Sequence, residues 1–566
     1  MMLPWQARLA DAVRSAARSA FGAELGELSF QYPPRLEMGD LALTAPFDLA
    51  RTLRRKPREI AERLAAELAG TPGVRRTEVA GGGYVNLFLD RAGFARELHA
   101  GLRRPAPSAR VAGHVIVEHT SINPNKSAHI GHLRNATLGD TFTRVLRHRG
   151  REVGVQNYID DTGVQVADVV VGLLHMEKKG LAEVQRIEGK FDDYCWDLYA
   201  RVGDFYAQDP ARRRLQAETL HAIESGDTET ARLAAYVAAR IVDCHLATME
   251  RLAIRYDLLA RESDILRLHF WERAFELLKQ AGALRLETEG KNAGCWVLTM
   301  ESEGSDEDKI IVRSNGTVTY TGKDIAYQLW KLGRLDRDFR YRRHRVHPDG
   351  HVLWTTTSAQ GEPGAPVFGH ASGVYNVIDV GQSYPQRVVK AGVAALAGPE
   401  AAAASHHLAY EKVVLSPATA RALGYAVAED EGAVKVSGRK GLGVKANDLI
   451  DALVAKARAE IDARDPERDP AAREGAAMAI AVGALRYFLL KFGRTKIITF
   501  DMEEALAFTG ETGPYIQNGV VRARTSLRNW RPRATGPRSW PRAARSSTWR
   551  RCSPGPRATR RGRCSC

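Results

Sequence analysis

Apolar and polar positions between residues 114 and 159 predict a strand, a helix and a second strand in succession. Residues 114–120 form a short apolar run, and polar, turn-rich residues follow at 121–126. A helix that ends at Gly150 is indicated by apolar residues at helical spacing, which are Leu138, Phe142, Val145 and Leu146. With a second apolar run at 152–159 this makes a βαβ unit. Such units bind ligands at the carboxyl ends of their strands.

Two other stretches have regular apolar patterns. At the N-terminus, an amphipathic helix, a helix around residues 57–61 and an alternating strand at 83–89 predict a separate α+β unit. From Asp469 onward one helical stripe is expected to pack in a core, namely Met478, Val482, Leu485, Leu489 and Phe492. A chain of 566 residues with these patterns is expected to contain several domains.

The middle of the chain allows two local predictions. Residues 309–313 and 317–320 flank Asn315-Gly316, a dipeptide typical of tight hairpins, so two paired strands are expected there. Residues 341–370 are rich in His, Gly and Pro and are predicted to be a loop insertion. Because these histidines lack the spacing of zinc ligands, no protein-bound zinc is predicted.

The junction between the first strand and the helix carries the most informative chemistry, the tetrapeptide His-Ile-Gly-His at residues 129–132. Gly131 has no side chain, so a nucleotide base can lie against the backbone, and the start of the helix offers free N–H groups to phosphate. His129 and His132 can donate hydrogen bonds to charge that develops on phosphoryl oxygens. Four residues alone do not distinguish this nucleotide site from two surface histidines near a helix cap.

The flanking sequence identifies a family. Residues 117–126 read Val-Glu-His-Thr-Ser-Ile-Asn-Pro-Asn-Lys, and residues 129–135 read His-Ile-Gly-His-Leu-Arg-Asn. Together they resemble the signature of class I arginyl-tRNA synthetases. Residues 156–165, Gln-Asn-Tyr-Ile-Asp-Asp-Thr-Gly-Val-Gln, also resemble that family. The resemblance extends from near the N-terminus to about Arg528, almost the whole chain.

The resemblance implies an α/β fold with a Rossmann-type catalytic domain, an α+β N-terminal domain and an α-helical C-terminal anticodon-binding domain. An N-terminal tRNA-contacting domain is expected at 1–105 and the catalytic domain, with insertions, at 106–405. A connecting region with a second signature loop follows at 406–465, and a partial helical anticodon-binding domain at 466–530. The family has further helices after this point; here residues 531–566 form an Arg-rich tail, which is expected to be disordered.

Arginine carries a permanently charged guanidinium with five donors, so a selective pocket needs carboxylates. Residues 320–327, which begin with Tyr320 and contain Asp324, resemble the arginine-binding segment of the family, and Glu262-Ser263 matches a second acidic motif. The arginine-binding residues that the resemblance implies are Glu118, Asn123, Glu262, Tyr320, Asp324 and Gln382. Asp324, Glu262 and Tyr320 are assigned to the guanidinium and Asn123 to the α-amino end, with Glu118 supporting the loop.

The second signature of the class is incomplete in this chain. Residues 435–441 read Lys-Val-Ser-Gly-Arg-Lys-Gly where the family motif is Lys-Met-Ser-Lys-Ser. Lys435 and Ser437 match the motif, but its second lysine is absent. We expect Lys126 to steady the phosphates in place of that lysine, with Lys440 or Arg439 assisting.

The resemblance also implies a two-step reaction. The arginine carboxylate attacks the α-phosphate of ATP, accompanied by Mg²⁺, and a ribose hydroxyl at the end of tRNA(Arg) then attacks the adenylate. Catalysis would come from positioning and charge stabilisation, and bound tRNA would be needed even for the first step. The expected partners are tRNA(Arg), L-arginine and ATP, and the expected state is a monomer.

Composition changes this picture at one end of the chain. Eleven of the 82 basic residues are arginines at 531–566, where there is no acidic residue, so the rest of the chain has 71 basic and 67 acidic residues, a net charge of +4 instead of +15. The tail is interpreted as an RNA-binding arm or, preferably, as the product of a reading frame lost near Trp530. No apolar run is long enough to span a membrane, and six cysteines without metal-ligand pairing favour a cytoplasmic protein.

Two alternatives remain open at this level. A class I-like nucleotidylyltransferase that acts on another small acid would share the His-Ile-Gly-His site but would not need Glu262 and Asp324. An RNA-binding remnant, inactive because of the altered C-terminus, would bind RNA without releasing pyrophosphate.

Overall fold

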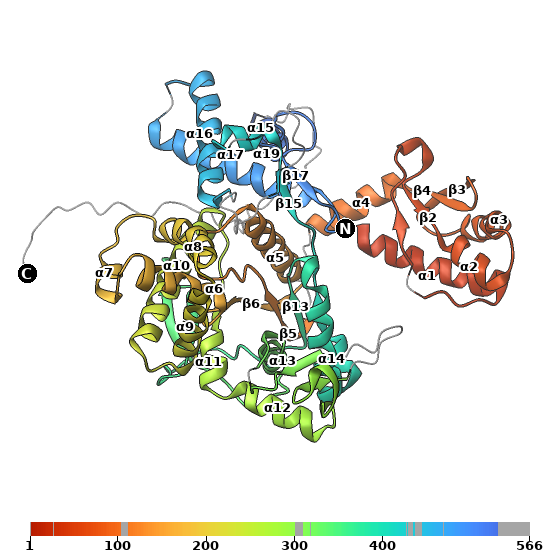
Figure 1. The fold of residues 1–566 in the computed structure, drawn as a ribbon. Helices are drawn as coiled ribbons and strands as arrows, with labels where there is room; N and C mark the ends of the chain where they lie inside the picture. The colour runs from red at the N-terminus through yellow and green to blue at the C-terminus, as the bar shows by residue number, and fades with distance from the viewer. Residues whose placement is uncertain are drawn as a thin grey trace, which may run out of the picture.

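A seven-stranded sheet with the order β11-β12-β7-β6-β5-β13-β14 lies at the centre of the computed structural model (Figure 1). Its strands are β5 (Val111–Glu118), β6 (Arg151–Ile159), β7 (Leu258–Arg261), β11 (Arg340–Val346), β12 (Val352–Thr357), β13 (Gly373–Asn376) and β14 (Ser405–His407). Neighbouring strands from β12 to β14 run parallel, and β11 pairs antiparallel with β12 at one edge. The structure describes residues 2–26, 28–103, 111–299, 309–316, 318–425, 427, 434–435, 444–467 and 469–529.

The predicted βαβ unit is confirmed as β5, α5 (Ile130–His148) and β6. Three of the four predicted helix positions pack against the valines of β5 and β6, whereas Val145 is 53% exposed. From β5 the chain continues to β6 on one side and returns much later to β13 on the other. The strand order therefore reverses beside β5, and this reversal leaves a crevice at the carboxyl ends of β5 and β13.

Helices cover both faces of the sheet, because alternate strand residues point to opposite sides. Leu259 packs in the core that contains α5, whereas Leu258 and Ile116 pack in the core of the opposite layer. That layer is formed by α11 (Glu262–Arg267), α12 (Phe270–Gln280), α13 (Tyr320–Lys331) and α14 (Ser383–Ala403), and beside it β8 (Leu284–Leu286), β9 (Trp296–Leu298) and β10 (Lys309–Val312) make a small antiparallel sheet. The expected Rossmann-type α/β architecture is confirmed.

A helical insertion separates β6 from β7. It contains α6 (Val164–Val171), α7 (Leu181–Gln185), α8 (Phe191–Gln208), α9 (Arg213–Ser225) and α10 (Glu229–Arg251). These helices have a core of their own, in which Val170, Leu198 and Val237 are fully buried. The other end of α10 packs in the core beside α5 through Leu246 and Met249. The insertion is therefore fixed to the main sheet.

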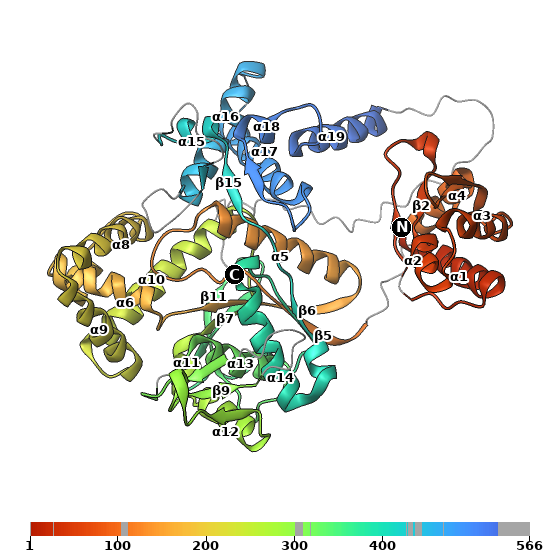
Figure 2. The same cartoon turned by 45° about the vertical axis from the view of Figure 1, so that its right-hand side comes forward.

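The N-terminal residues form a separate α+β unit, beside the rest of the molecule in Figure 2. Its antiparallel sheet has the order β1-β2-β4-β3, and the elements are α1 (Met2–Phe21), β1 (Phe30–Gln31), β2 (Leu41–Leu43), α2 (Ala45–Leu53), α3 (Pro57–Leu68), β3 (Val74–Ala80), β4 (Tyr84–Leu89) and α4 (Arg91–Arg103). Val13, Leu64 and Leu87, from two helices and the sheet, share one buried core. This is the α+β unit that the apolar pattern predicts.

The C-terminal part combines helices with a short sheet of order β16-β15-β17. Its elements are β15 (Val413–Leu415), α15 (Pro417–Ala422), β16 (Val434–Lys435), α16 (Ala446–Arg464), α17 (Pro470–Lys491), β17 (Ile498–Phe500), α18 (Met502–Leu506) and α19 (Gly513–Asn529). Of the predicted stripe, Leu485 and Leu489 are buried in the same core as Leu133 of α5. Phe492 lies just beyond the end of α17. This shared core joins the C-terminal helices to the helix layer on the main sheet.

Two local predictions need correction. Residues 341–370 are not a loop insertion, because β11 and β12 occupy most of the first half and complete one edge of the main sheet. The strand β11 was missed because it is rich in arginine. An edge strand needs few buried residues, and in β11 only Tyr341 is buried. The predicted hairpin around Asn315-Gly316 keeps one strand, β10, and a single bridge between Val312 and Val318. Its second arm passes directly into α13, which begins at Tyr320.

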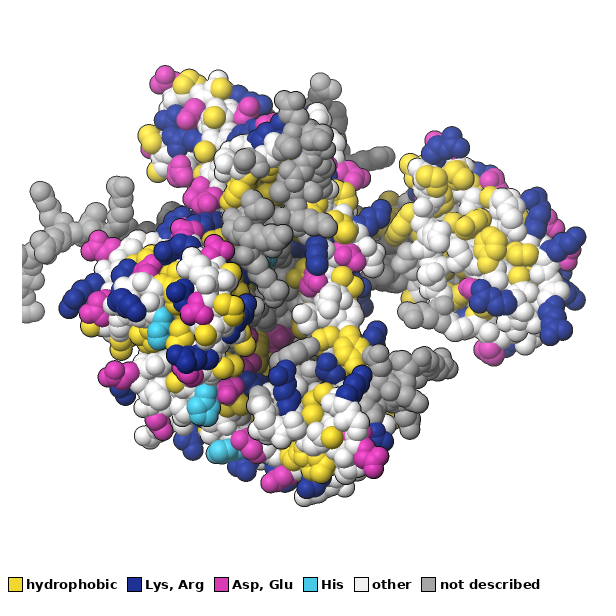
Figure 3. All heavy atoms as spheres, viewed as in Figure 1, with side chains coloured by type: hydrophobic (Ala, Val, Ile, Leu, Met, Phe, Trp, Pro, Cys, Tyr) yellow, Lys and Arg dark blue, Asp and Glu magenta, His cyan; other side chains and the backbone are white. Residues whose placement is uncertain are grey.

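Surface charge agrees with the small net charge expected outside the tail. On the face shown in Figure 3, basic and acidic side chains of the described residues are interspersed over the insertion and the N-terminal unit. None of the helices in the described ranges combines the length and apolar composition needed to cross a membrane.

Candidate active site

A cavity of about 770 Å³ opens at the carboxyl ends of β5 and β13. Its wall is formed by the end of β5, the loop that follows it, the first turn of α5 and one face of α13. Predicted site residues that line it are Glu118, Asn123, Lys126, His132, Glu262, Asp324 and Gln382. The fold thus gathers residues from four separate segments of the chain, 118–132, 262, 324 and 382, at the point where the strand order reverses.

A second cavity, of about 720 Å³, shares His132 with the first. His129 and Gly131 line it together with Gly381 and Val413 from segments that follow β13 and β14. A Cβ atom at Gly131 would lie 3.0 Å from Cε1 of His129, so a larger residue would displace the histidine ring. The glycine therefore keeps both the backbone and His129 accessible to this cavity.

The two histidines form a stacked pair. Their ring centroids are 3.6 Å apart, and the backbone N–H of His129 donates to Nδ1 of His132 at 3.1 Å. Because Nδ1 accepts, a neutral His132 carries its proton on Nε2. Burial, with Lys126 nearby, lowers the pKa of His129 to about 3, and burial and the His129 ring lower the pKa of His132 well below its usual value. Both imidazoles are therefore neutral near pH 7.

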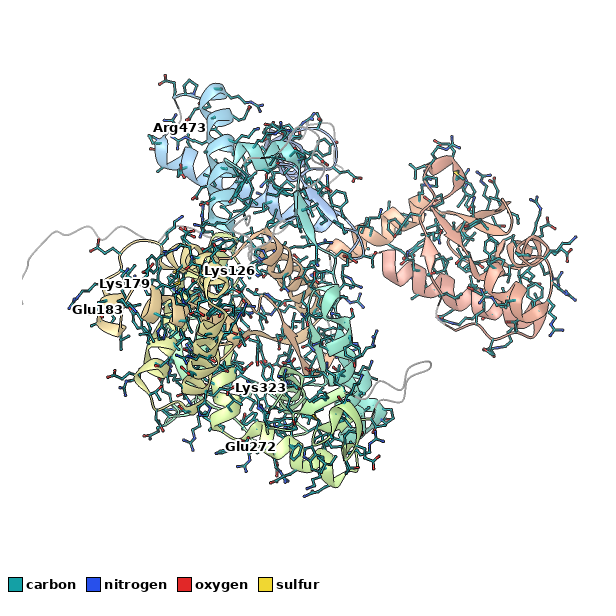
Figure 4. The ribbon with its side chains drawn as sticks, in the orientation of Figure 1. Lys126, Lys179, Glu183, Glu272, Lys323 and Arg473 are labelled. Carbon is teal, nitrogen blue, oxygen red and sulfur yellow. The ribbon has the colours of Figure 1, made fainter. Side chains whose placement is uncertain are left out.

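The loop before α5 is held by the helical insertion. Lys126, labelled in Figure 4, places its ammonium 5.9 Å from the ring centroid of Trp196 and 5.3 Å from that of Tyr199, both on α8. From α10, Nε2 of His245 donates to the Lys126 carbonyl at 2.7 Å. Asn125 in the same loop is fully buried, and neither polar atom of its side chain has a hydrogen-bond partner among the described residues. The loop is thus fixed on one side and carries an unused amide on the other.

Glu262 lies at the start of α11 and accepts three hydrogen bonds from protein side chains. Nζ of Lys323, Oγ1 of Thr162 and the hydroxyl of Tyr158 each donate to its carboxylate at 2.7 Å. Burial opposes its ionisation, but Lys323 and these hydrogen bonds outweigh burial and lower the pKa of Glu262 below its ordinary value. Figure 4 places Lys323 near the start of α13. A lysine of the protein therefore already neutralises this predicted arginine ligand.

Glu118 at the end of β5 has a similar partner. Its carboxylate forms an ion pair with Lys331 of α13, and both side chains are almost completely buried. Lys331 also donates to Asn376 and to Gln328, each at 3.1 Å. This network connects α13 to the ends of β5 and β13, on either side of the strand-order reversal.

Asp324 differs from these two carboxylates, because no ion pair joins it to another described residue. It lines the cavity one turn into α13, between Glu262 and Glu118. Burial is the main cause that raises its pKa to about 7, and the charges of Glu262 and Glu118 add to it. Asp160 also lines the cavity, and burial beside Glu262 raises its pKa well above the usual range. Asp324 and Asp160 are thus poorly compensated carboxyls that a cation would stabilise.

The remaining predicted residues have different positions. Asn123 is half-buried in the loop after β5, and Gln382 is exposed just before α14. Asp379, near Gln382, accepts a hydrogen bond from the Gly381 N–H at 2.8 Å and so shapes this loop. Ser437, Arg439, Lys440 and the side chains of Tyr320 and Lys435 lie outside the described residues. Their assignments stay predictions.

Several residues of the cavity were not predicted from the sequence. Tyr327, Gln328 and Lys331 follow Asp324 at intervals of three, four and seven residues, so all four lie on one face of α13. That spacing was available in the sequence and, once Asp324 was assigned, indicates the rest of the wall. Asp160 and Lys323 gave no comparable signal, because their roles arise from contacts between distant segments.

A mainly parallel sheet with a strand-order reversal, and a histidine pair at the first turn of the helix beside it, are features expected of a class I aminoacyl-tRNA synthetase. Family models agree with this class. One described as "Arginyl tRNA synthetase N terminal domain" matches residues 5–89, and one described as "tRNA synthetases class I (R), catalytic domain" matches residues 98–339.

Relatives and solved structures narrow the class to one family. The chain is 39% identical over 502 residues to an arginine–tRNA ligase of Thermus thermophilus, with 88% of this chain and 77% of the relative covered. It is 35% identical over 548 residues to that of Thermococcus kodakarensis, covering 92% and 82%. The solved Thermus thermophilus arginyl-tRNA synthetase superimposes with a TM-score of 0.74 at 34% identity, over 95% of this chain and 84% of that one. The chain belongs to the arginyl-tRNA synthetase family.

Proposed function

We propose that this chain is an arginine–tRNA ligase that uses ATP to activate arginine and then transfers it to tRNA(Arg). The observation that carries the proposal is the pairing of carboxylates in the cavity. Lysines of the protein neutralise Glu262 and Glu118, and Asp324 lies beside them with no such partner in the described part of the chain. A cavity that holds a poorly compensated carboxyl next to a nucleotide-type histidine pair suits a small cationic acid.

ATP is proposed to lie across the two cavities. Its adenosine would occupy the cavity of Gly131 and His129, and its phosphates would approach the start of α5, where free N–H groups favour anions. Nε2–H of His132 would donate to a phosphoryl oxygen. Lys126 would contribute its charge from the loop, and Mg²⁺ would enter with the phosphates. Lys435, Ser437, Arg439 and Lys440 remain assigned to this end.

Arginine is proposed to lie with its guanidinium on Asp324 and Tyr320. Glu262 is proposed to attract the guanidinium through its negative charge, without a direct hydrogen bond. Protein donors, among them Lys323 and Thr162, already occupy most of its acceptor sites. Asn123 would hold the α-amino end and Gln382 would close the outer side of the cavity. Glu118, held by Lys331, would support the loop. This arrangement leaves the carboxylate of arginine toward the histidines, where it would attack the α-phosphate.

The N-terminal unit and α16 to α19 are proposed to contact tRNA, with the boundaries of the five regions as predicted above. A monomer in the cytoplasm is proposed as the working form. Light scattering of the purified chain at several concentrations tests whether it is a monomer, because a monomer gives a mass of 62.3 kDa at every concentration.

ATP–pyrophosphate exchange with each amino acid, with and without tRNA, tests the proposed function. We expect exchange with arginine alone among the amino acids, and only when tRNA is present. Exchange with another small acid would support the nucleotidylyltransferase alternative. RNA binding without any exchange would support the inactive remnant.

Lys126→Ala tests the role of the loop lysine in the same assay. Because Lys126 replaces the missing second lysine of the degenerate signature, we expect exchange to fall by about 10²-fold. Lys279→Ala is the matched control, since Lys279 also lies over a tryptophan ring, Trp296, but on α12 away from the cavity. Equal exchange in both variants would show that Lys126 does not stabilise the phosphates.

A further inference from the structure

One face of helix α8 contacts the nucleotide-binding loop at several points. Asp193, Trp196 and Asp197 are spaced by three and four residues and so share this face. Oγ of Ser127 donates a hydrogen bond to Asp193, and the ring of His129 lies edge-on to Trp196 with centroids 6.4 Å apart. With Lys126 above Trp196 and Tyr199, this face touches three of the four residues that precede α5.

The same aspartate is approached from the C-terminal part of the chain. Nζ of Lys445 lies 3.9 Å from Asp193 and 3.6 Å from Asp197. Backbone contacts hold the same two segments together. The Ala446 N–H donates to the Ala128 carbonyl at 2.7 Å, and the backbones of Lys445 and His129 form an isolated antiparallel β-bridge. In sequence, Lys445 stands four residues beyond Gly441, the end of the second signature segment.

Burial distinguishes the two aspartates. The side chain of Asp193 is 20% exposed and contacts a buried serine, whereas the side chain of Asp197 is 71% exposed. Water screens an exposed pair strongly, so the pair of Lys445 with Asp197 contributes little despite its shorter distance. Asp193 is also the member that contacts both segments, through Ser127 on one side and Lys445 on the other.

We propose that Asp193 is a positioning residue that sets the first signature, at residues 126–132, in register with the start of the C-terminal part that follows the second signature. The proposal rests on the function proposed above, in which both signatures bind one ATP. Groups that hold a substrate in reactive geometry lose much of their effect when they shift by about 1 Å. Asp193 would therefore affect ATP use while lying outside the ATP-binding cavities.

Kinetics of arginine-dependent pyrophosphate exchange provide the first test. Asp193→Ala is expected to raise KM for ATP relative to kcat by about tenfold or more, with KM for arginine within about twofold of wild type. Asp197→Asn is the control, expected to stay within about twofold for all three constants. Asp193→Asn can still accept from Ser127 but has no charge for Lys445, so it separates the two contacts. The double variant Asp193→Asn with Lys445→Met should have the same KM for ATP as Asp193→Asn alone, since both substitutions remove the same interaction.

Hydrogen exchange of the purified full chain gives a readout that does not depend on catalysis. In Asp193→Ala, amides of both residues 123–129 and residues 444–448 are expected to exchange faster, while Asp197→Asn leaves both unchanged. Faster hydrogen exchange in only one of the two segments would overturn the proposal. An equal rise in KM for ATP and KM for arginine, accompanied by a lower Tm, would also overturn it. If the wild-type chain does not activate arginine, the proposed function is wrong. The hydrogen-exchange measurement still decides whether Asp193 joins the two segments.

Discussion

We expect one carboxyl, Asp324, to make the binding of arginine depend on pH. Its pKa is raised to about 7, chiefly by burial. In the proposed assignment the guanidinium of arginine, which stays charged, binds the ionised form of Asp324, so binding below pH 7 must displace a proton. KM for arginine should therefore rise by up to about tenfold per pH unit below 7 and be constant above it. Exchange kinetics between pH 5.5 and 8.5 measure this, and a constant KM for arginine would contradict it.

The matched variant, Asp324→Asn, should lose the pH dependence together with most arginine affinity. It also has an effect on stability with a definite sign. A carboxyl whose folded pKa is raised contributes stability below its unfolded pKa, near 4, and this contribution is lost as pH rises through 7. Asp324→Asn should therefore raise Tm relative to wild type at pH 8 and not at pH 4. KM for ATP is not expected to change.

At this scale the sequence predicted acids and histidines but not their partners. Asp324, Glu262 and His132 were found from motifs, and all three line the cavity. That Lys323 occupies Glu262 and Lys331 occupies Glu118 depends on α13 lying across the ends of β5 and β7. No local sequence pattern marks these two lysines as partners of the acids, because each contact joins segments that are far apart in the sequence.

Helix α5 joins the catalytic sheet to the C-terminal sheet through Arg134. The side chain is fully buried, and its guanidinium donates to backbone carbonyls of Glu411, Lys412, Gly493, Arg494 and Lys496. Arg134→Met would remove the donor of the Glu411 and Lys496 carbonyls, whereas those of Lys412, Gly493 and Arg494 also accept from backbone N–H groups. We expect the free energy of unfolding to fall by about 2–4 kcal/mol, measured by urea denaturation of the full chain.

Arg144→Met on the same helix is the control for this prediction. The Arg144 side chain is 58% exposed and pairs with Asp140, so its loss should cost at most about 1 kcal/mol. Arg134→Lys separates charge from shape, because lysine keeps the charge without the planar fork. If Arg134→Lys were as stable as wild type, the fork would not be the basis of the joint.

Elements with a strong period were predicted well, and elements that depend on tertiary pairing were not. The sequence predicted β5, α5 and β6 because apolar residues recur with clear strand and helix periods. It missed β11, whose Arg-rich strand is recognisable only through its pairing with β12. Likewise the hairpin signal at Asn315-Gly316 could not show that α13 begins at Tyr320 in place of a second strand.

The whole molecule raises the question of what its strongly basic tail contributes. Residues 531–566 hold eleven arginines and no acid, whereas the rest of the chain is nearly neutral. A tail of this composition attracts any RNA by charge, and each phosphate that it binds adds to the salt dependence of binding. A dedicated RNA-binding arm and a sequence produced by a lost reading frame share this property. They differ in whether arginylation at physiological salt needs the tail.

Deletion of residues 531–566 separates these two interpretations. If the tail arises from a lost frame, the shortened chain should arginylate tRNA within about twofold of the full chain at 0.15 M salt. Affinity for unrelated RNA should fall at low salt, and the slope of log K against log salt should become shallower by about 0.7 for each single-strand phosphate that the shortened chain no longer binds. Filter binding from 0.05 to 0.3 M salt measures that slope. A fall of tenfold or more in arginylation at 0.15 M and limiting tRNA(Arg), with arginine activation unchanged at saturating tRNA(Arg), would instead show that the tail takes part in binding tRNA(Arg).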